Sequence, residues 1–516
     1  MRRMKGAAGL LTALLLAFQL SAQTFALANE DNGIKVVPVN FTHNGYSYEI
    51  EGVAKSTDGD YQIKSPARLA ARKLPSTYDP RSSGEITTVK DQASTGACWA
   101  FSALACAEQD LIKKGLENPS TEFSVPALVL SSNSGTATGK DDFSSGGNWL
   151  FAASALANGQ GLCYEDYEPF LESGTENMIV SENKKSVSEY RLNYVMELSS
   201  TTQVKRKIME LGAVSASYFA GNGYMNHNNT AYYDPDASKN TIINHSLTVV
   251  GWDDNYSKDN FRYKPANNGA WLVKGSWGAD QDNDGFYWVS YDEAEFGQFC
   301  CYDFEESCDN TYHYSKMTGY VVNASNDGSV YGANVFTAKA DEKLDKAGFM
   351  YVGKTGSADY TLSVYTDVSD SDPIGVLETQ ISGSVSANGF YTVDFPEDIL
   401  LEEGEKYSIS VKFSGDSGRG YLLAESDRTS KAQSGQSYVS LNGKYWSDVG
   451  ADKTDSIGSL FIYAYTDDTA KPDKSSLEST LAKYGTLAGC EREANNARTV
   501  LADETASKND ISNAQK

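Results

Sequence analysis

The chain has 516 residues, 40% of them hydrophobic, and its formal net charge is −25 because 69 acidic residues outnumber 44 basic ones. A chain of this length is too long for one hydrophobic core and predicts two to four domains. The acidic balance argues against nucleic acid as a partner, since nucleic-acid recognition needs a basic surface. No run after residue 28 approaches the roughly 20 apolar residues that a membrane-spanning helix needs.

The first 28 residues have the pattern of a secretory signal peptide, with a basic start, an apolar centre and a small-residue cleavage site at residues 1–5, 10–20 and 26–28. The signal predicts a secreted, extracellular protein, with attachment to a cell surface as an open alternative. Residues 29–73 are short and polar, and we expect a propeptide or an N-terminal extension. Export permits disulfides, yet the seven cysteines form no dense framework. A bridge from Cys300 or Cys301 to Cys308 is one alternative.

The segment from Gln92 to Ser102 carries the strongest functional signal in the chain. Cys98 follows Gln92 by six positions, and two small residues precede it. An apolar pattern with helical spacing starts at Cys98 and includes Phe101, Leu104, Ala105, Leu111 and Ile112. A helix N-terminus favours negative charge, so Cys98 is predicted to be a nucleophile. The side-chain amide of Gln92 and the backbone N–H of Cys98 are its candidate oxyanion donors.

His245 is the candidate partner of this thiol. It is one of four histidines and opens an apolar, strand-like run that ends at Trp252. An imidazole beside a thiol can hold the thiolate in an ion pair and later protonate the leaving amine. The alternative interpretations are a satisfied core histidine at His245 and an inert buried cysteine at Cys98. Cys106, eight residues farther along the same predicted helix, fits the role of a core thiol better.

Taken in order, these motifs resemble the papain-like cysteine peptidases between residues 74 and 291. Leu74–Arg81 (Leu-Pro-Ser-Thr-Tyr-Asp-Pro-Arg) is similar to the start of the mature enzymes, and Gly146-Gly147 to the paired glycines that bind substrate backbone. Residues 271–278 (Trp-Leu-Val-Lys-Gly-Ser-Trp-Gly) are similar to the segment with the family's Lys-Asn-Ser-Trp-Gly. His245 lies 147 residues after Cys98 (245 − 98), inside the family's range of about 130–150.

The resemblance implies an α+β papain-like fold over residues 74–308, with a helical left half and a β-barrel-like right half. It also implies hydrolysis of protein or peptide substrates without a cofactor or a metal ion. The residues it assigns to catalysis are Cys98, His245 and Gln92, and those it assigns to substrate binding are Gly146, Gly147, Ser246 and Trp277.

Three features depart from the family pattern. Gly275 stands where the family has the asparagine that orients the histidine, so water or the neighbouring Ser276 would have to replace it. Thr95 and Ser144 stand where the family has the two cysteines of one disulfide, and both are replaced together. Gln281 replaces a second tryptophan.

The acidic run from Asp280 to Gly285 has the Asp-x-Asp-x-Asp-Gly pattern that begins an EF-hand calcium loop. Its twelfth position is Tyr291 instead of the glutamate that binds calcium through both oxygens, and no flanking helix pair is predicted. We therefore expect an ordinary hairpin turn and no metal site.

Residues 309–468 change to period-two alternation, which predicts an all-β sandwich domain. Apolar and polar residues alternate from Tyr407 to Phe413, and turn signals such as Asn442-Gly443 separate similar runs. Its place after a papain-like domain resembles the lectin-like domain of certain secreted bacterial papain-like peptidases. Trp446 and exposed tyrosines would either stack on a sugar ring or pack internally. We expect packing, and cell-surface glycans are kept as an alternative partner.

Residues 469–516 predict a short α-helical tail, with helical spacing at Leu477, Leu481, Tyr484 and Ala488. The segment resembles a three-helix repeat of bacterial cell-surface proteins whose last helix is truncated at Lys516. A solvated helical tail is the equal alternative.

The sequence thus predicts a secreted cysteine endopeptidase that cleaves peptide bonds through a Cys98–His245 pair and a thioester acyl-enzyme. Low disulfide use favours a bacterial exoenzyme over an animal lysosomal one. The alternative is a weakly active or inactive papain fold that serves as a surface adhesin or glycan-binding protein, as Gly275 and the β-sandwich suggest. An acyl-transferring thiol enzyme of another fold fits poorly with the order of Gln92, Cys98, His245 and Trp277.

Overall fold

The computed structural model describes the chain in segments, to which all structural statements refer: residues 34–36, 40–43, 46–49, 74–132, 143, 146–159, 161–166, 169–170, 189–221, 223–237, 243–279, 284–294, 296–315, 320–325, 328–369, 371–416, 419–426, 432–451, 457–469, 474–486, 490–502, 511 and 514. The predicted signal peptide lies outside the described residues, as do Ser144 and residues 280–283.

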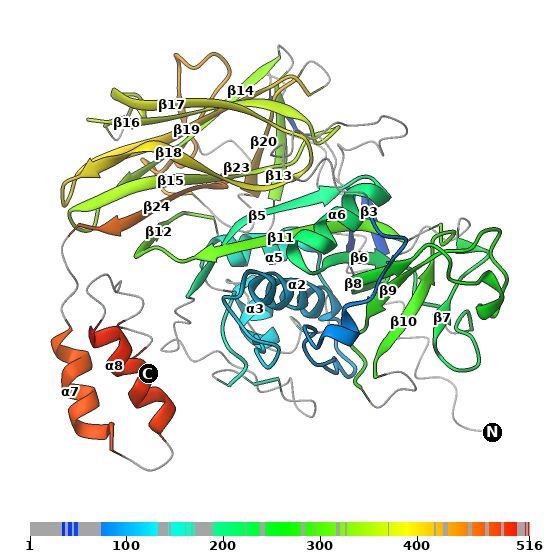
Figure 1. The fold of residues 1–516 in the computed structure, drawn as a ribbon. Helices are drawn as coiled ribbons and strands as arrows, with labels where there is room; N and C mark the ends of the chain where they lie inside the picture. The colour runs from blue at the N-terminus through cyan, green and yellow to red at the C-terminus, as the bar shows by residue number, and fades with distance from the viewer. Residues whose placement is uncertain are drawn as a thin grey trace, which may run out of the picture.

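The chain from residue 74 to about 312 contains a helical side and a β side, as predicted (Figure 1). Its helices are α2 (Cys98–Lys114), α3 (Val125–Ser132), α5 (Trp149–Ala157) and α6 (Thr201–Leu211), with 3-10 helices η2 (Pro80–Ser83) and η5 (Lys258–Asn260). Its strands are β4 (Thr77–Tyr78), β5 (Tyr190–Leu198), β6 (Val214–Tyr218), β7 (Ala231–Tyr232), β8 (His245–Asp253), β9 (Ala270–Lys274), β10 (Phe286–Ser290), β11 (Gly297–Glu306) and β12 (Asn310–Tyr312).

Helix α2 runs through the centre of this part and packs against strands β8 and β11 and against the other three helices (Figure 1). Every residue from Trp99 to Leu111 is buried, so tertiary packing rather than intrinsic propensity holds the helix together. Gly115 ends it in the left-handed conformation (φ 73°) and donates its N–H to the carbonyls of Leu111 and Ile112.

The second part of the chain is the predicted all-β domain. Its strands are β13 (Tyr320–Ser325), β14 (Ser329–Thr337), β15 (Glu342–Tyr351), β16 (Ala358–Thr366), β17 (Val376–Val385), β18 (Gly389–Leu401), β19 (Lys406–Ser414), β20 (Tyr421–Ser426), β21 (Ser437–Ser440), β22 (Ser447–Asp448), β23 (Ile457–Leu460) and β24 (Ile462–Asp468). One face is the sheet β17-β16-β19-β14-β21-β22, and the short strand β1 (Ile34–Val36) adds to a second sheet, β1-β13-β20-β23. Strands β2 (Asn40–His43) and β3 (Tyr46–Glu49) form a separate hairpin.

The alternation from Tyr407 to Phe413 holds only in part. The apolar residues are buried as expected, but Ser408 and Ser410 are buried as well. Strand β19 is central, with β14 on one side and β16 on the other, and its serine face is also covered. The Ser408 hydroxyl accordingly donates a hydrogen bond to the Pro373 carbonyl at 2.5 Å.

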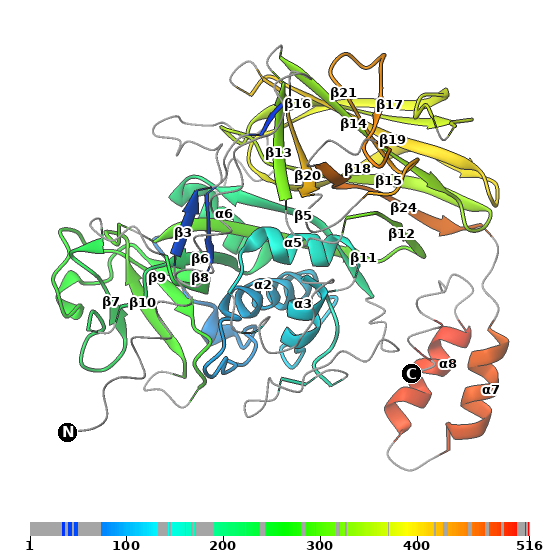
Figure 2. The ribbon, with the colours of Figure 1, turned by 180° about the vertical axis from the view of Figure 1, so that it is seen from behind.

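The two parts share one sheet, which the sequence did not predict. Among the described residues, a 12-stranded sheet runs from β12, β24, β15 and β18 into β5, β11, β6, β8, β9, β10 and β7, with β4 paired to β8 beside this path. Strands β18 and β5 join the halves through the pairs Gly389↔Met196, Phe390↔Val195 and Tyr391↔Tyr194. Figure 2 shows this continuity from behind, with β18 and β15 above β5 and β11.

A buried carboxylate reinforces the joint between the two parts. Glu197 on β5 accepts hydrogen bonds from Trp149 Nε1 on α5 and from Asn388 Nδ2 beside β18, both at 3.0 Å. Burial raises the pKa of Glu197, and these two donors oppose the rise. Because the bonds link three elements across the joint, the β domain is built into the first part rather than tethered to it.

The aromatic residues of the β domain are divided between packing and exposure. Trp446 is partly buried and packs against Ala333, Val335 and Tyr438, in agreement with the expected packing role. Its neighbour Tyr445 is 81% exposed.

The chain continues into α7 (Ser475–Tyr484) and α8 (Glu491–Ala502), which confirms a helical tail. Leu477, Ala497 and Ile511 form a small separate core there. Within the described segments, no helix is long and apolar enough to span a membrane.

Candidate active site

Cys98 is the first residue of α2, so its thiol lies at a helix N-terminus as predicted. The side chain is half-buried. Burial raises the pKa of the Cys98 thiol, and the backbone N–H groups of Ser246 and Trp99 oppose that rise. The interaction with Ser246 places the thiol beside the start of β8, where His245 is the first residue.

Ser102 fixes α2 against β8 one helical turn beyond Cys98. Its hydroxyl donates to the Leu247 carbonyl at 2.6 Å and accepts from Thr248 Oγ1 at 3.3 Å. Both hydroxyl-bearing side chains are buried, where losing a hydrogen-bond partner costs about 1–3 kcal/mol. Ser102 therefore fixes the position of α2, and with it the Cys98 thiol, along β8, the strand that begins at His245. The sequence identified Ser102 only as the last residue of the segment from Gln92 to Ser102.

His245 is 6% exposed and is enclosed by aromatic rings. The Trp277 ring stacks on it with centroids 4.4 Å apart and planes 14° apart, and the Tyr218 ring meets it nearly perpendicularly at 5.8 Å. Trp277 is itself 39% exposed, so it separates the imidazole from solvent. Burial lowers the pKa of His245 to about 3. The Nε2 atom of the ring has no hydrogen-bond partner among the described residues.

Gln92 is buried, and its amide is held in one orientation. Its Oε1 accepts from the Ser276 hydroxyl at 2.6 Å, and its Nε2 donates to the Thr95 carbonyl at 2.8 Å. An amide nitrogen carries two protons, so one N–H remains to donate to a ligand. Ser276, which the sequence suggested as a partner for His245, is thus used to orient Gln92.

The two glycines lie immediately before α5. Gly146 has a positive φ of 70°. A Cβ on Gly147 would approach Cε2 of the Trp99 indole to 2.4 Å, so only glycine fits there without movement. Asn148 caps α5 by accepting from the Leu150 N–H at 2.9 Å. Gly147 therefore lies against Trp99, the residue that follows Cys98.

Ser246 is half-buried beside His245, and its hydroxyl is 3.1 Å from the Ser217 hydroxyl on β6. Together, Cys98, His245, Gln92, Gly147 and Trp277 come from four separate parts of the chain and lie around the start of α2.

Comparison with known proteins identifies the two parts of the chain. Residues 74–326 match the model of the papain family cysteine proteases, and residues 311–466 match the model of the lectin-like domains. The first part belongs to the papain family of cysteine proteases. The second part is a lectin-like domain.

Curated relatives support this assignment for the protease domain. The chain is 24% identical to mouse cathepsin K over 216 residues, which covers 42% of this chain and 59% of that protein. It is 25% identical to human cathepsin L2 over 224 residues, covering 43% and 62%. The chain therefore spans about three-fifths of the length of these relatives.

Solved structures match both domains together. The cysteine protease and lectin-like domains of Cwp84, a surface layer associated protein of Clostridium difficile, align with a TM-score of 0.66 and 27% identity. That match covers 77% of this chain and 90% of Cwp84 as solved. A second structure, of clostridial Cwp84 after propeptide cleavage, is 28% identical with a TM-score of 0.66 and covers 76% and 99%.

The papain-family domain lacks the usual orienting side chain at Gly275. Gly275 directly follows β9, and its N–H donates to the Gly285 carbonyl at 3.0 Å. The absence of a side chain at Gly275 is consistent with the unpartnered Nε2 of His245. Among the described residues, Cys300, Cys301 and Cys308 form no disulfide, so the suggested bridges to Cys308 are not formed.

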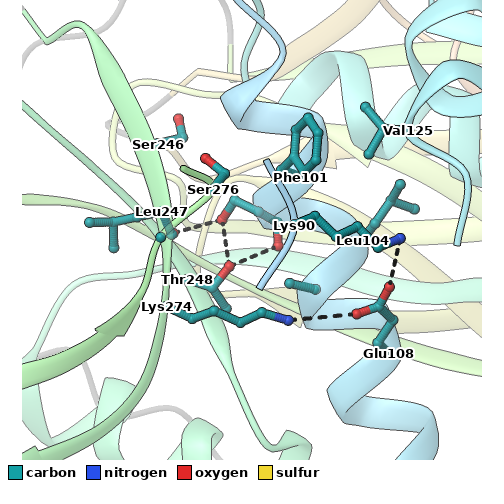
Figure 3. Close-up of a pocket in the computed structure, with 13 residues that line it drawn as sticks. Lys90, Phe101, Leu104, Glu108, Val125, Ser246, Leu247, Thr248, Lys274 and Ser276 are labelled. Atoms are coloured by element: carbon teal, nitrogen blue, oxygen red, sulfur yellow. Dashed lines mark hydrogen bonds and ion pairs between the residues drawn. The ribbon is translucent and has the colours of Figure 1, made fainter. Parts of the chain in front are cut away.

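A buried ionic cluster supports the strand that leads to Gly275. Lys274 and Glu108 are 4% and 2% exposed, and Lys274 Nζ lies 3.9 Å from Glu108 Oε2. Thr87 connects them, since its hydroxyl donates to Glu108 at 2.6 Å and accepts from Lys274 at 2.6 Å. Lys90 Nζ lies 3.6 Å from the other Glu108 oxygen. The cluster lines a small pocket of about 20 Å³ between α2, β8 and β9 (Figure 3).

Proposed function

We propose that the chain is a secreted cysteine endopeptidase that hydrolyses peptide bonds in protein substrates. The observation that carries the proposal is the placement of a helix-terminal thiol against the N-terminal end of β8. Cys98 begins α2, its thiol interacts with the Ser246 N–H, and His245 is the preceding residue. The domain order 74–308, 309–468 and 469–516 remains part of the proposal.

The proposed reaction proceeds in two halves. His245 takes the thiol proton as Cys98 Sγ attacks the substrate carbonyl carbon, and the oxygen gains negative charge. The free Gln92 N–H and the Cys98 backbone N–H donate to that oxygen. The C–N bond then breaks as His245 returns the proton to the leaving amine, which leaves a thioester. Water, deprotonated by His245, attacks the thioester and regenerates the thiol.

The proposal also assigns roles to the two ring nitrogens of His245. Nε2 is enclosed and bonds to no partner, the Cys98 sulfur included. We therefore assign the exchange of the thiol proton to Nδ1. An imidazole that accepts a proton at Nδ1 carries its own proton at Nε2.

Secretion and surface association are also proposed. The signal-like N-terminus supports export, and the matched Cwp84 is described as surface layer associated. Proteins or peptides are the proposed substrates, and the lectin-like domain is compatible with cell-surface glycans as a further partner.

A second candidate function is a weakly active papain fold that serves as a surface adhesin. It is favoured by the unpartnered Nε2 of His245 and by the raised pKa of the half-buried Cys98 thiol. Both features oppose a stable thiolate–imidazolium pair.

Labelling with a thiol-directed epoxide peptidase inhibitor separates the two functions. In the active enzyme, Cys98 should be the modified cysteine, and His245→Ala should slow its labelling on the order of 10²-fold or more, because the imidazole no longer takes the thiol proton. Peptide mapping by mass spectrometry identifies the modified cysteine, and Cys98→Ala is the negative control. If Cys98 reacts no faster than the half-buried Cys490, the adhesin becomes the better description.

Gly147→Ala tests whether the glycine pair forms the substrate-binding wall. The new Cβ would need Trp99 to move, since contacts under 3.0 Å are essentially never observed. We expect kcat/KM for a peptide substrate to fall on the order of 10²-fold, the cost of displacing reacting groups by about 1 Å. Gly297→Ala is the control because nothing lies within 4 Å of its Cβ position. Equal kinetics for the two variants would refute this role for Gly147.

A further inference from the structure

The enclosed nitrogen of His245 lacks an acceptor that the proposed reaction needs. Nε2 carries a proton in the tautomer that can take the thiol proton at Nδ1. A buried N–H without an acceptor is costly, and the cost grows once the ring is an imidazolium. Gly275 offers no side chain, and the Ser276 hydroxyl donates to Gln92.

Two buried tyrosine hydroxyls lie in the same aromatic enclosure. Tyr218 on β6 and Tyr287 on β10 are 1% and 4% exposed, and their hydroxyl oxygens are 2.8 Å apart. Neither hydroxyl is needed for packing, which a phenylalanine ring would serve equally well. A buried hydroxyl pair is retained at a desolvation cost, so it points to a polar role at this place.

Three contacts bring this pair to His245. Tyr218 is the register partner of His245 across β6 and β8, and its ring meets the imidazole at 5.8 Å. Trp277 stacks on His245 and also on Tyr287, the latter with planes 7° apart and centroids 6.4 Å apart. The Tyr287 ring also lies over Gly275, with Cε1 3.5 Å from the position that a Cβ there would take.

The hydroxyl pair has spare acceptor capacity. Each phenol oxygen carries one proton and can accept hydrogen bonds, and the single bond between the two uses only one acceptor. The pair can therefore accept a proton from Nε2–H before and after the imidazole becomes charged. The free protein has no hydrogen bond at Nε2, but catalytic hydrogen bonds are often long without substrate and shorten when substrate binds.

We propose that Tyr218 and Tyr287 are the positioning residues of His245, and that their paired hydroxyls accept the Nε2 proton in the space left open at Gly275. This inference rests on the proposed peptidase function. In the usual family pattern an asparagine side chain orients the histidine. Here the two tyrosine hydroxyls would orient His245 instead, while the nucleophile and the base stay the same.

Tyr287→Phe and Tyr218→Phe test the proposal by removing one hydroxyl each. We expect kcat for a peptide substrate to fall on the order of ten- to a hundred-fold with KM nearly unchanged, because a charge-assisted hydrogen bond is lost in the transition state. The pH at which Cys98 alkylation by iodoacetamide accelerates should move upward, since the imidazolium that stabilises the thiolate loses its acceptor.

Tyr232→Phe is the matched control. Its ring also meets Tyr218, at 5.1 Å, but its hydroxyl donates to the Phe219 carbonyl and lies outside the pair. Loss of that hydroxyl should leave kcat and the alkylation profile at wild-type values, whatever it does to thermal stability.

Gly275→Asn in the Tyr287→Phe background should restore kcat at least several-fold, because the amide oxygen supplies the missing acceptor. The position has ordinary backbone geometry, and its Cβ would lie 3.3 Å from the Gly285 carbonyl oxygen, so only a slight shift is needed. Full kcat in both tyrosine variants would overturn the inference, as would lowered kcat without rescue, which would indicate packing alone. A wild-type protein that neither hydrolyses peptides nor labels at Cys98 would instead refute the proposed function.

Discussion

Cys98→Ala is expected to lower kcat/KM for peptide hydrolysis by about 10⁴-fold or more, because removing the nucleophile of a hydrolase leaves only binding and oxyanion stabilisation. The substitution removes one sulfur atom at the N-terminus of α2. The adjoining Trp99 stays buried, and the Ser102–Leu247 bond stays in place. The folded structure should therefore survive, and the loss should appear in kcat at unchanged protein stability. Steady-state kinetics and a thermal melt of each variant measure both quantities.

Cys106→Ala is the comparison for this loss. Cys106 lies on the same helix eight residues later and is 1% exposed, and its pKa is raised well above the usual range by burial. A thiol held in the protonated form in the core takes no part in the reaction. We expect Cys106→Ala to keep wild-type kinetics and Cys98→Ala to lose turnover. Residual hydrolysis in Cys98→Ala above about 1% of wild type would show that another group attacks the substrate.

Glu108→Ala is expected to reduce the free energy of unfolding by about 3–5 kcal/mol, the usual cost of leaving a buried charge without its partner. Glu108 accepts from the Thr87 hydroxyl and from the Phe123 N–H at 3.1 Å, besides its ion pairs with Lys90 and Lys274. Burial lowers the pKa of Lys274, and Glu108 opposes that fall. Because Lys274 precedes Gly275, Ser276 and Trp277, activity should fall with stability. Urea unfolding followed by tryptophan fluorescence measures the change in the free energy of the first unfolding transition.

Two further variants are the controls for this prediction: Glu85→Ala, and Glu108→Met combined with Lys274→Met. Glu85 pairs with Lys113 at 3.8 Å, and the two side chains are 51% and 32% exposed, so its loss should change stability by less than about 1 kcal/mol. Glu108→Met combined with Lys274→Met leaves neither of the two buried charges and should be more stable than Glu108→Ala alone. Equal destabilisation by Glu85→Ala and Glu108→Ala would contradict the importance of the buried cluster.

Local patterns in the sequence predicted several elements correctly, since they depend on neighbours along the chain. The helical spacing after Cys98 predicted α2, and the apolar run after His245 predicted β8. Turn signals and alternation predicted the all-β domain from residue 309, and helical spacing predicted the tail. The alternation in β19 failed at Ser408 because burial of both faces depends on what the sheet packs against.

The sequence by itself determined which residues are the candidate nucleophile, base and oxyanion donor, because their spacing follows a family pattern that needs no coordinates. It also determined the absence of a side chain at Gly275. Only the tertiary structure decided what surrounds them. Ser276 meets Gln92 across 184 residues, and Tyr218 meets Tyr287 across 69. Contacts of this kind depend on strand order and register, and the sheet shared through β5 and β18 depends on them too. Pairings between distant strands are set by which apolar faces can be buried together, and no window of local sequence contains that information.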